Sequence, residues 1–290
     1  PEKPITMLIA FRPGGAVDTT GRLLAANLEK NLGQPIVAVT KSGGGGTVMA
    51  STLINADPDG YTIGMGASAA YTLAPQLNSK IAYKIDDFDH LATLTIPQDA
   101  LVVVTKSPWN TLADMVQDAK SNNKTLSVAS QVAVVNMMAL AIAKKDGIKF
   151  RIVPVKGGSR GIQQVLGGHV DLTWSGSGWH KQVAAGTMKP LVSLGSKRNP
   201  DYPNLPTMKE LGYNYAFTDT FMLSAPKGLP KAVHDKLAAA IKASLTPDLS
   251  KQLISKMKLA TDYRGPKETT AFLHEQYNTV KPLVAEMRKK

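Results

Sequence analysis

The chain has 290 residues, of which 43% are hydrophobic, contains no cysteine and carries a formal net charge of +12. A chain of this length can bury a sizeable core and is long enough for two domains. The absence of cysteine excludes disulfides, thiolate catalysis and cysteine-ligated metals, and charged residues interrupt every apolar run before it reaches the roughly 18 residues of a membrane span.

Short β-rich runs alternate with helical patterns along the chain, which is typical of parallel sheets covered by helices. The predicted strands are 5–10, 36–40, 62–66, 100–105, 127–130, 150–155, 171–175, 191–194 and 221–225. The first helix is expected from Asp18 to Leu32, with Gly33 as its C-terminal stop. These patterns predict an α/β fold.

The junction between the first strand and the first helix, Phe11 to Asp18, has the composition of an anion-binding turn. Gly14 and Gly15 allow positive φ angles and close approach of a ligand, and Asp18 or Thr19 can cap the helix. The free N–H groups and the positive dipole end of that helix then face the turn. The alternative is that this glycine-rich turn only reverses the chain.

Two strands suggest how the chain divides into domains. The segments 100–105 and 221–225 are each followed by a proline-containing turn and a helix. If the chain crosses between domains at both, one lobe consists of 1–100 plus 225–290 and the other of 101–224. Two crossings form a hinge, with the ligand in the cleft between the lobes.

Much of the positive charge lies near the C-terminus, where residues 227–290 contain 13 Lys or Arg against 6 Asp or Glu. This region is predicted to form amphipathic helices whose lysines lie on the polar faces. No basic motif with interleaved aromatic residues accompanies them. We therefore expect no nucleic-acid partner, although the charge favours anionic ligands.

An ordered set of short motifs extends over the whole chain. They are Lys3-Pro-Ile-Thr6, Phe11-x-Pro-Gly-Gly15-x-x-Asp18, Leu32-Gly-Gln-Pro-Ile36, Gly43-Gly-Gly-Gly-Thr47, Asp57-Pro-Asp-Gly-Tyr61, Asp86-Asp-Phe88, Pro154-Val-Lys-Gly-Gly158, Leu166-Gly-Gly-His-Val-Asp171, Pro203-Asn-Leu-Pro-Thr207 and Ala225-Pro-Lys-Gly228. In this order they resemble the substrate-binding proteins of tripartite tricarboxylate transporters, the Bug-type periplasmic receptors.

The resemblance implies a two-lobed binding protein of the Venus-flytrap type, in which each lobe is a mostly parallel sheet flanked by helices. Such a protein captures an organic carboxylate between its lobes, closes about its hinge and delivers the ligand to a membrane transporter. It implies no enzyme activity, no cofactor and no metal, and we expect a monomer. Because Pro1 to Pro4 leads directly into the first strand, we expect a mature periplasmic chain whose signal peptide has been removed.

In the family, backbone N–H groups and ordered waters hold the ligand carboxylate between the turn after the first strand and a loop of the second lobe. Glycine-rich or hydroxyl-bearing turns follow several strand ends here, where ligands of open α/β sheets collect. The candidate ligand-binding residues are Phe11, Arg12, Gly14, Gly15, Ala16, Asp18, Ala67, Ser68, Ser130, Gln131, Gly158, Ser159, Ser175, Gly176 and Asp219.

Two departures from the family pattern bear on the ligand. Arg12 stands where the family has a small, apolar or proline residue, and its guanidinium could clamp a carboxylate, or else be solvated at the rim. In the second lobe, Ser130 to Asn136 replaces a Gly-rich stretch and favours a more apolar pocket. Trp174 and Trp179 could stack on an aromatic ligand or pack in the core. Together these features point to a dicarboxylate, which could be aromatic, such as terephthalate.

A serine hydrolase is the alternative from another class. The turn Gly157-Gly158-Ser159-Arg160-Gly161 satisfies the G-x-S-x-G pattern between a strand and a helix. Asp171 or Asp219, followed by His234 or His274, would complete a triad in chain order. No oxyanion motif is present, however, and the five histidines show no metal-binding spacing.

Overall fold

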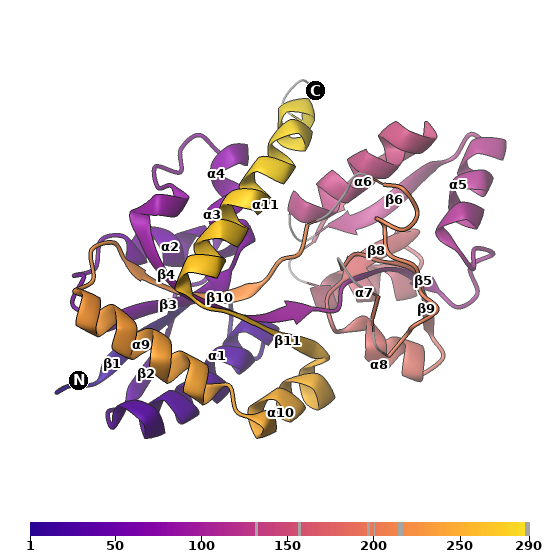
Figure 1. Cartoon of the computed structure of the whole chain (residues 1–290). Coiled ribbons are helices and arrows are strands. Elements are labelled where there is room, and N and C mark those ends of the chain that lie inside the picture. Colours follow the sequence, from indigo (N-terminus) through magenta and orange to yellow (C-terminus); the bar gives the residue numbers. More distant parts are fainter. Residues whose placement is uncertain (131–132, 156–157, 196–197, 200, 214–216, 288–290) are drawn as a thin grey trace. The chain divides into compact units, whose positions relative to one another are not determined.

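The computed structural model describes residues 1–130, 133–155, 158–195, 198–199, 201–213 and 217–287 (Figure 1). The chain divides into two compact units. Unit 1 comprises Pro1–Ile96 and Asp219–Pro282, and unit 2 comprises Pro97–Thr218 and Leu283–Lys290. Among the described residues, no helix combines the length and the low polarity that a bilayer-spanning segment requires.

Unit 1 is built on a six-stranded sheet with the order β11-β4-β10-β3-β1-β2. Its strands are β1 (Ile5–Ile9), β2 (Ile36–Thr40), β3 (Thr62–Ala67), β4 (Phe88–Pro97), β10 (Phe221–Pro226) and β11 (Leu259–Arg264). Its helices are α1 (Ala16–Leu32), η1 (Gly44–Gly46), α2 (Thr47–Leu53), α3 (Ala69–Thr72), α4 (Ala74–Leu77), η2 (Ile85–Asp87), α9 (Lys231–Ser244), α10 (Pro247–Met257) and the part of α11 (Pro266–Met287) up to Pro282. β1 pairs in parallel with β2 and β3, whereas β10 runs antiparallel to β3 and β4.

Two apolar clusters cover the two faces of this sheet. On one face, α1, α9 and α10 pack on the sheet through residues such as Leu24, Leu28 and Ile241. Asn27 and Asn31 of α1 also donate hydrogen bonds to Ser244 of α9, at 3.0 and 2.8 Å. On the other face, α2, α3 and α11 contribute to a second cluster. The sheet is therefore buried on both sides, as expected for parallel strands.

Unit 2 is built on a five-stranded sheet with the order β7-β6-β8-β5-β9. Its strands are β5 (Ala100–Val104), β6 (Thr125–Ser130), β7 (Lys149–Pro154), β8 (Leu172–Ser175) and β9 (Met188–Ser193), and its helices are α5 (Leu112–Ser121), α6 (Ala133–Asp146), α7 (Gly158–Leu166) and α8 (Trp179–Ala184). β6 pairs in parallel with β7 and β8, and β5 runs antiparallel to β8 and β9. Each unit thus has a parallel core to which antiparallel strands are added, and the predicted two-lobed α/β class is confirmed.

Three details differ from the sequence predictions. The strands β4 and β11 were not predicted, because both interrupt their apolar residues with charged or polar ones. Helix α1 begins at Ala16, two residues before the expected start at Asp18, and Gly33 ends it at φ 70° as predicted. The boundaries between the units also fall a few residues before positions 100 and 225, and Leu283–Lys290, predicted in the first lobe, belongs to unit 2. β10 lies wholly in unit 1 because it pairs with β3 and β4 of that unit.

Candidate functional site

The carboxyl ends of β1 and β3 form a topological switch point in unit 1. β2 and β3 lie on opposite sides of β1, and ligands of open α/β sheets bind at such switch points. β1 and β3 are in register, with Ile9 opposite Met65. The predicted residues from Phe11 to Asp18 and at Ala67 and Ser68 therefore lie at or just after the ends of neighbouring strands.

The turn after β1 is closed by its own backbone. The Gly15 N–H donates to the Arg12 carbonyl at 3.3 Å, and Gly14 has a φ of +79°, which favours glycine. Gly15 is the N-cap of α1 and has no side chain to satisfy the first helical N–H groups. These groups have no partner one turn earlier in the helix and carry its positive dipole end.

Asp18 does not cap α1 as expected, nor does Thr19; this prediction was wrong. Asp18 is the third residue of the helix, and its carboxylate accepts a hydrogen bond from the Gly14 N–H at 3.0 Å. Its other oxygen accepts from Arg22 Nε at 2.9 Å, and the residue is only 3% exposed. Asp18 thus holds the turn in place, while its predicted contact with the ligand stays a prediction.

Arg12 is exposed, and Phe11 and Ala16 are partly exposed, on the same turn. Within the described part of the chain, Arg12 forms no ion pair, whereas Arg22 is committed to Asp18. The turn therefore combines an available guanidinium with the N-terminus of a 17-residue helix. Both features attract anions.

Ser68 and Asp219 form a second polar group at this edge. The Ser68 side chain is fully buried and donates to Asp219 Oδ1 at 3.3 Å, and the Ala69 N–H donates to the same oxygen at 3.0 Å. Burial raises the pKa of Asp219 from 3.8 to about 6, against the opposing effect of these two hydrogen bonds. The carboxyl group thus titrates closer to neutrality than an exposed aspartate.

A third turn belongs to this edge and was not among the predicted site residues. A Cβ added at Gly46 would lie 3.1 Å from the Ala70 Cβ and 3.9 Å from Phe11 Cε2. The turn after β2 therefore touches the turns after β1 and β3. All four of its glycines, 43–46, have positive φ angles. The sequence signal was this glycine run, which lacks the lysine and hydroxyl residue of a phosphate-binding loop.

In unit 2, the predicted residues Ser130 and Ser175 lie at the ends of the adjacent parallel strands β6 and β8. β7 and β8 flank β6, so this edge is also a switch point. Both serines are buried, and Ser130 Oγ donates to Asn136 Oδ1 at 2.9 Å. Gly176 follows β8, and a Cβ there would lie 3.3 Å from Asp99 Oδ1.

Gly158 and Ser159 are the first two residues of α7, which follows β7. Their predicted ligand contacts stay predictions, as do those of the other candidate residues. Gln131 and Gly157 lie outside the described residues.

Trp174 and Trp179 are core residues. They are 3% and 0% exposed. The Trp179 ring stacks on His180 with 3.8 Å between ring centroids, and its Nε1 donates to the Gln98 carbonyl at 2.7 Å. Of the two interpretations, packing in the core therefore applies, and neither indole is available to stack on an aromatic ligand in this structure.

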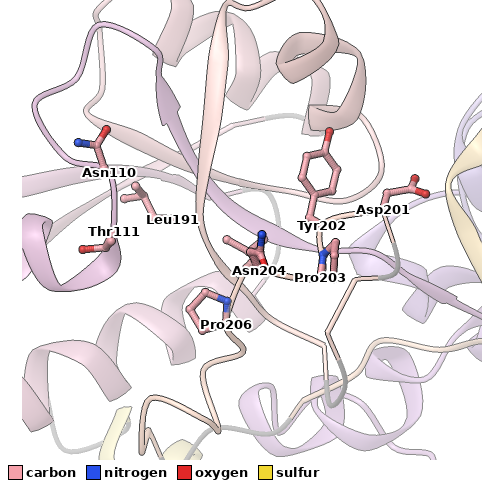
Figure 2. A pocket seen from close by; sticks show the side chains of 9 residues that line it. Asn110, Thr111, Leu191, Asp201, Tyr202, Pro203, Asn204 and Pro206 are labelled. Atoms are coloured by element: carbon pink, nitrogen blue, oxygen red, sulfur yellow. The ribbon is translucent and has the colours of Figure 1, made fainter.

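Two pockets occur on unit 2. One of about 360 Å³ lies between the residues just before α5 and the segment after β9 (Figure 2), and it is lined by Asn110, Thr111, Leu191, Asp201, Tyr202, Pro203, Asn204, Leu205 and Pro206. The other, of about 350 Å³, is lined by Val153, Pro154, Val155, Arg160 and Gln164. Neither lining includes a predicted ligand-binding residue, although the second flanks Gly158 and Ser159.

The arrangement gives the hydrolase alternative no support. Asp171 Oδ2 accepts hydrogen bonds from the backbone N–H and the hydroxyl of Ser127, both at 2.6 Å. His234 and His274 lie in α9 and α11 of unit 1, where they face Asp235 and Asp86. No described contact joins Ser159 to a histidine.

Two α/β units, each with glycine and hydroxyl residues at a topological switch point, define a bilobed solute-binding protein. The chain belongs to the tripartite tricarboxylate transporter family of receptors, whose family model matches residues 20–288. As a member of this family it is a solute-binding receptor and not an enzyme, which confirms the resemblance found in the sequence.

Individual relatives agree with this assignment. A protein encoded in the gbd 5' region of Cupriavidus necator is 30% identical over 290 residues, which cover 99% of this chain and 88% of the relative. The structure of the periplasmic binding protein BugD is 27% identical, with a TM-score of 0.82 over 100% of this chain and 97% of its own. MatC from Rhodopseudomonas palustris, solved with bound malate, is 27% identical, with a TM-score of 0.84 over 98% and 99% of the two chains.

Proposed function

We propose that this receptor captures a small organic carboxylate, preferably a dicarboxylate, in the periplasm and delivers it to a membrane transporter of the tripartite tricarboxylate type. The observation that carries the proposal is the turn from Phe11 to Gly15, where an exposed arginine and an uncapped helix N-terminus lie at the β1/β3 switch point. The malate found in the related MatC supports a carboxylate as the ligand class.

The proposed site supplies enough binding energy without a catalytic or metal group. Hydrogen bonds to a charged group contribute about 1.5 to 3 kcal/mol each, so three of them reach about 4.5 to 9 kcal/mol before entropic costs. Micromolar affinity corresponds to about 8 kcal/mol. The first-turn N–H groups of α1 and the Arg12 guanidinium are the donors that we assign to this role.

A ligand screen tests the proposal. The melting temperature of the full chain is measured with mono- and dicarboxylates, including malate, succinate, adipate, citrate and terephthalate, and at least one should raise it. A panel without any shift would refute the assignment of the ligand class. Adding each hit to the S159A variant then tests the expected contribution of unit 2.

Charge reversal of Arg12 tests the site itself. R12E should weaken a dicarboxylate by about tenfold to a hundredfold, and more than its monocarboxylate analogue, because the guanidinium is proposed to hold one of two carboxylates. K80E is the matched control, since Lys80 is exposed in unit 1 and its reversal changes the net charge equally. Equal losses for both ligands, or equal effects of R12E and K80E, would place Arg12 outside the site.

A further inference from the structure

Asp219 lies where the chain enters unit 1 for the second time, immediately before β10. β10 is antiparallel to β3, with Phe221 opposite Ala67, so the start of β10 and the end of β3 lie at one edge of the sheet. The Ser68 N–H donates to the Thr220 carbonyl at 2.9 Å, and the Thr220 N–H donates to Ser68 Oγ at 3.1 Å. The backbone that carries Asp219 is therefore held firmly.

Among the described residues, partners engage only one oxygen of Asp219. Oδ1 accepts from Ala69 N–H and Ser68 Oγ, whereas the hydrogen bonds of the described residues include none to Oδ2. No lysine, arginine or histidine in the described ranges forms an ion pair with this carboxylate, and no charged group contributes to the rise of its pKa, which burial causes. Asp219 is partly exposed, so a small molecule can reach the free oxygen.

This free acceptor lies close to the proposed carboxylate site. β3 separates β10 from β1 in the sheet, and neighbouring strands are about 4.8 Å apart, so the relevant ends of β1 and β10 are roughly 10 Å apart. Gly46 lies beside both strand ends, because a Cβ added there would lie within 4 Å of both Phe11 and Ala70. Ala70 directly follows Ala69, which donates to Asp219.

We propose that Asp219 is a specificity-determining residue, which accepts a hydrogen bond from a hydroxyl or ammonium group of the ligand. The inference rests on the function proposed above. A ligand that carries such a donor can bond the Asp219 oxygen that has no described partner. An analogue without the donor leaves the partly buried Asp219 charge unpaired, beside the negative charge of the ligand's own carboxylate. Sites built around a buried acceptor discriminate strongly against ligands that lack the donor.

The test compares matched ligands by titration calorimetry on the full chain at pH 7.5. Malate and aspartate carry a hydroxyl and an ammonium group, respectively, and succinate is the analogue that lacks both. The wild-type chain should bind malate or aspartate at least about tenfold more tightly than succinate, as expected for a hydrogen bond to a charged acceptor. Which of the two is favoured identifies the donor.

The variant D219N removes the charge but keeps an oxygen for the Ala69 N–H, and it should reduce this affinity ratio to about one- to threefold. D89N is the control, because Asp89 also belongs to unit 1 but pairs across from Ala225, about 20 Å along β10 from Asp219. D89N should leave the ratio unchanged. D219S is the second neutral variant, used if circular dichroism shows that D219N does not fold.

The outcomes separate this inference from the proposed function. A wild-type ratio near one, or a ratio that D219N and D219S leave unchanged, overturns the role of Asp219 while carboxylate binding stands. If none of the three ligands nor any other carboxylate of the screen binds, the proposed function fails and the inference fails with it. A tenfold ratio that is lost only in the Asp219 variants supports both.

Discussion

Replacing His90 with glutamine should change the pH dependence of stability of unit 1. His90 is 3% exposed in β4, and its Nε2 lies 2.9 Å from the Ile85 carbonyl. A carbonyl can only accept, so the neutral ring carries its proton on Nε2, and Nδ1 accepts from the Ser224 hydroxyl at 2.9 Å. Glutamine is neutral at every pH and supplies one donor and one acceptor.

Burial lowers the pKa of His90 from 6.5 to about 4, and the charge of Lys227 adds to the fall. The hydrogen bond to the Ile85 carbonyl and the charges of Asp86 and Asp89 oppose it. Because the folded-state pKa is below the unfolded value, the unfolded chain binds the proton more readily. The stability from neutral His90 is therefore complete above pH 6.5 and is lost as the pH falls toward 4. At 1.36 kcal/mol per pKa unit, the loss between pH 7.5 and 5 is about 2 kcal/mol.

Asp219 acts in the opposite direction over the same interval. Its pKa is raised from 3.8 to about 6 by burial, so the folded chain takes up the proton first, and stability increases as the pH falls through 6. With allowance for its partial exposure, this gain is about 1 kcal/mol between pH 7.5 and 5. The wild-type chain should therefore lose about 1 kcal/mol from these two groups, whereas H90Q should gain about 1 kcal/mol.

The assay must report on unit 1. All three tryptophans, at 109, 174 and 179, lie in unit 2, so their fluorescence does not monitor the surroundings of His90. Hydrogen exchange of the β4 and β10 amides at pH 7.5 and 5, corrected for the intrinsic rates, gives the free energy of opening for each variant. The same change with pH in H90Q and in the wild-type chain would refute the reasoning.

Two further predictions concern stability. Thr111 caps α5 and accepts from the Asp114 N–H at 3.1 Å, so T111A should destabilise unit 2 by about 1 kcal/mol. Urea unfolding followed by tryptophan fluorescence measures this loss, and an unchanged unfolding midpoint would contradict it. A Cβ at Gly64 would lie 2.6 Å from Met49 Sδ, so G64A should cost about 1 to 3 kcal/mol by circular dichroism. G265A is the control, because an added Cβ at Gly265 meets only the Tyr263 hydroxyl, at 3.7 Å. It should lower the free energy of unfolding less than G64A does, and equal losses would exclude overpacking as the cause.

Local sequence patterns were sufficient for most strands. The nine predicted strands all occur, because each is a short apolar run between turn residues, and β2 matches its predicted range 36–40. β4 was missed although it lies inside the sheet. Several of its polar residues are buried, and one is held by a distant partner: the Thr93 N–H donates to Thr269 Oγ1 at 3.0 Å across a separation of 176 residues.

In the turn after β1, local sequence predicts some features of the site but not others. Its glycines and the helix that follows could be recognised because their backbone requirements are local. The role of Asp18 could not be recognised. An aspartate near a helix start can be the N-cap, or it can lie three positions later and accept from a preceding N–H group, as Asp18 does from Gly14. Only the observed start of α1 at Ala16 distinguishes them.

The amino-acid sequence by itself determined the α/β class, the receptor family and the glycine-rich turn beside the first helix, because short-range periodicity, turn chemistry and motif order carry that information. The tertiary structure decided which distant residues share that edge of the sheet. Ser68 and Asp219 are 151 positions apart, and the antiparallel pairing of β10 with β3 brings them together. Their burial, which raises the pKa of Asp219, likewise depends on long-range packing that no local pattern encodes.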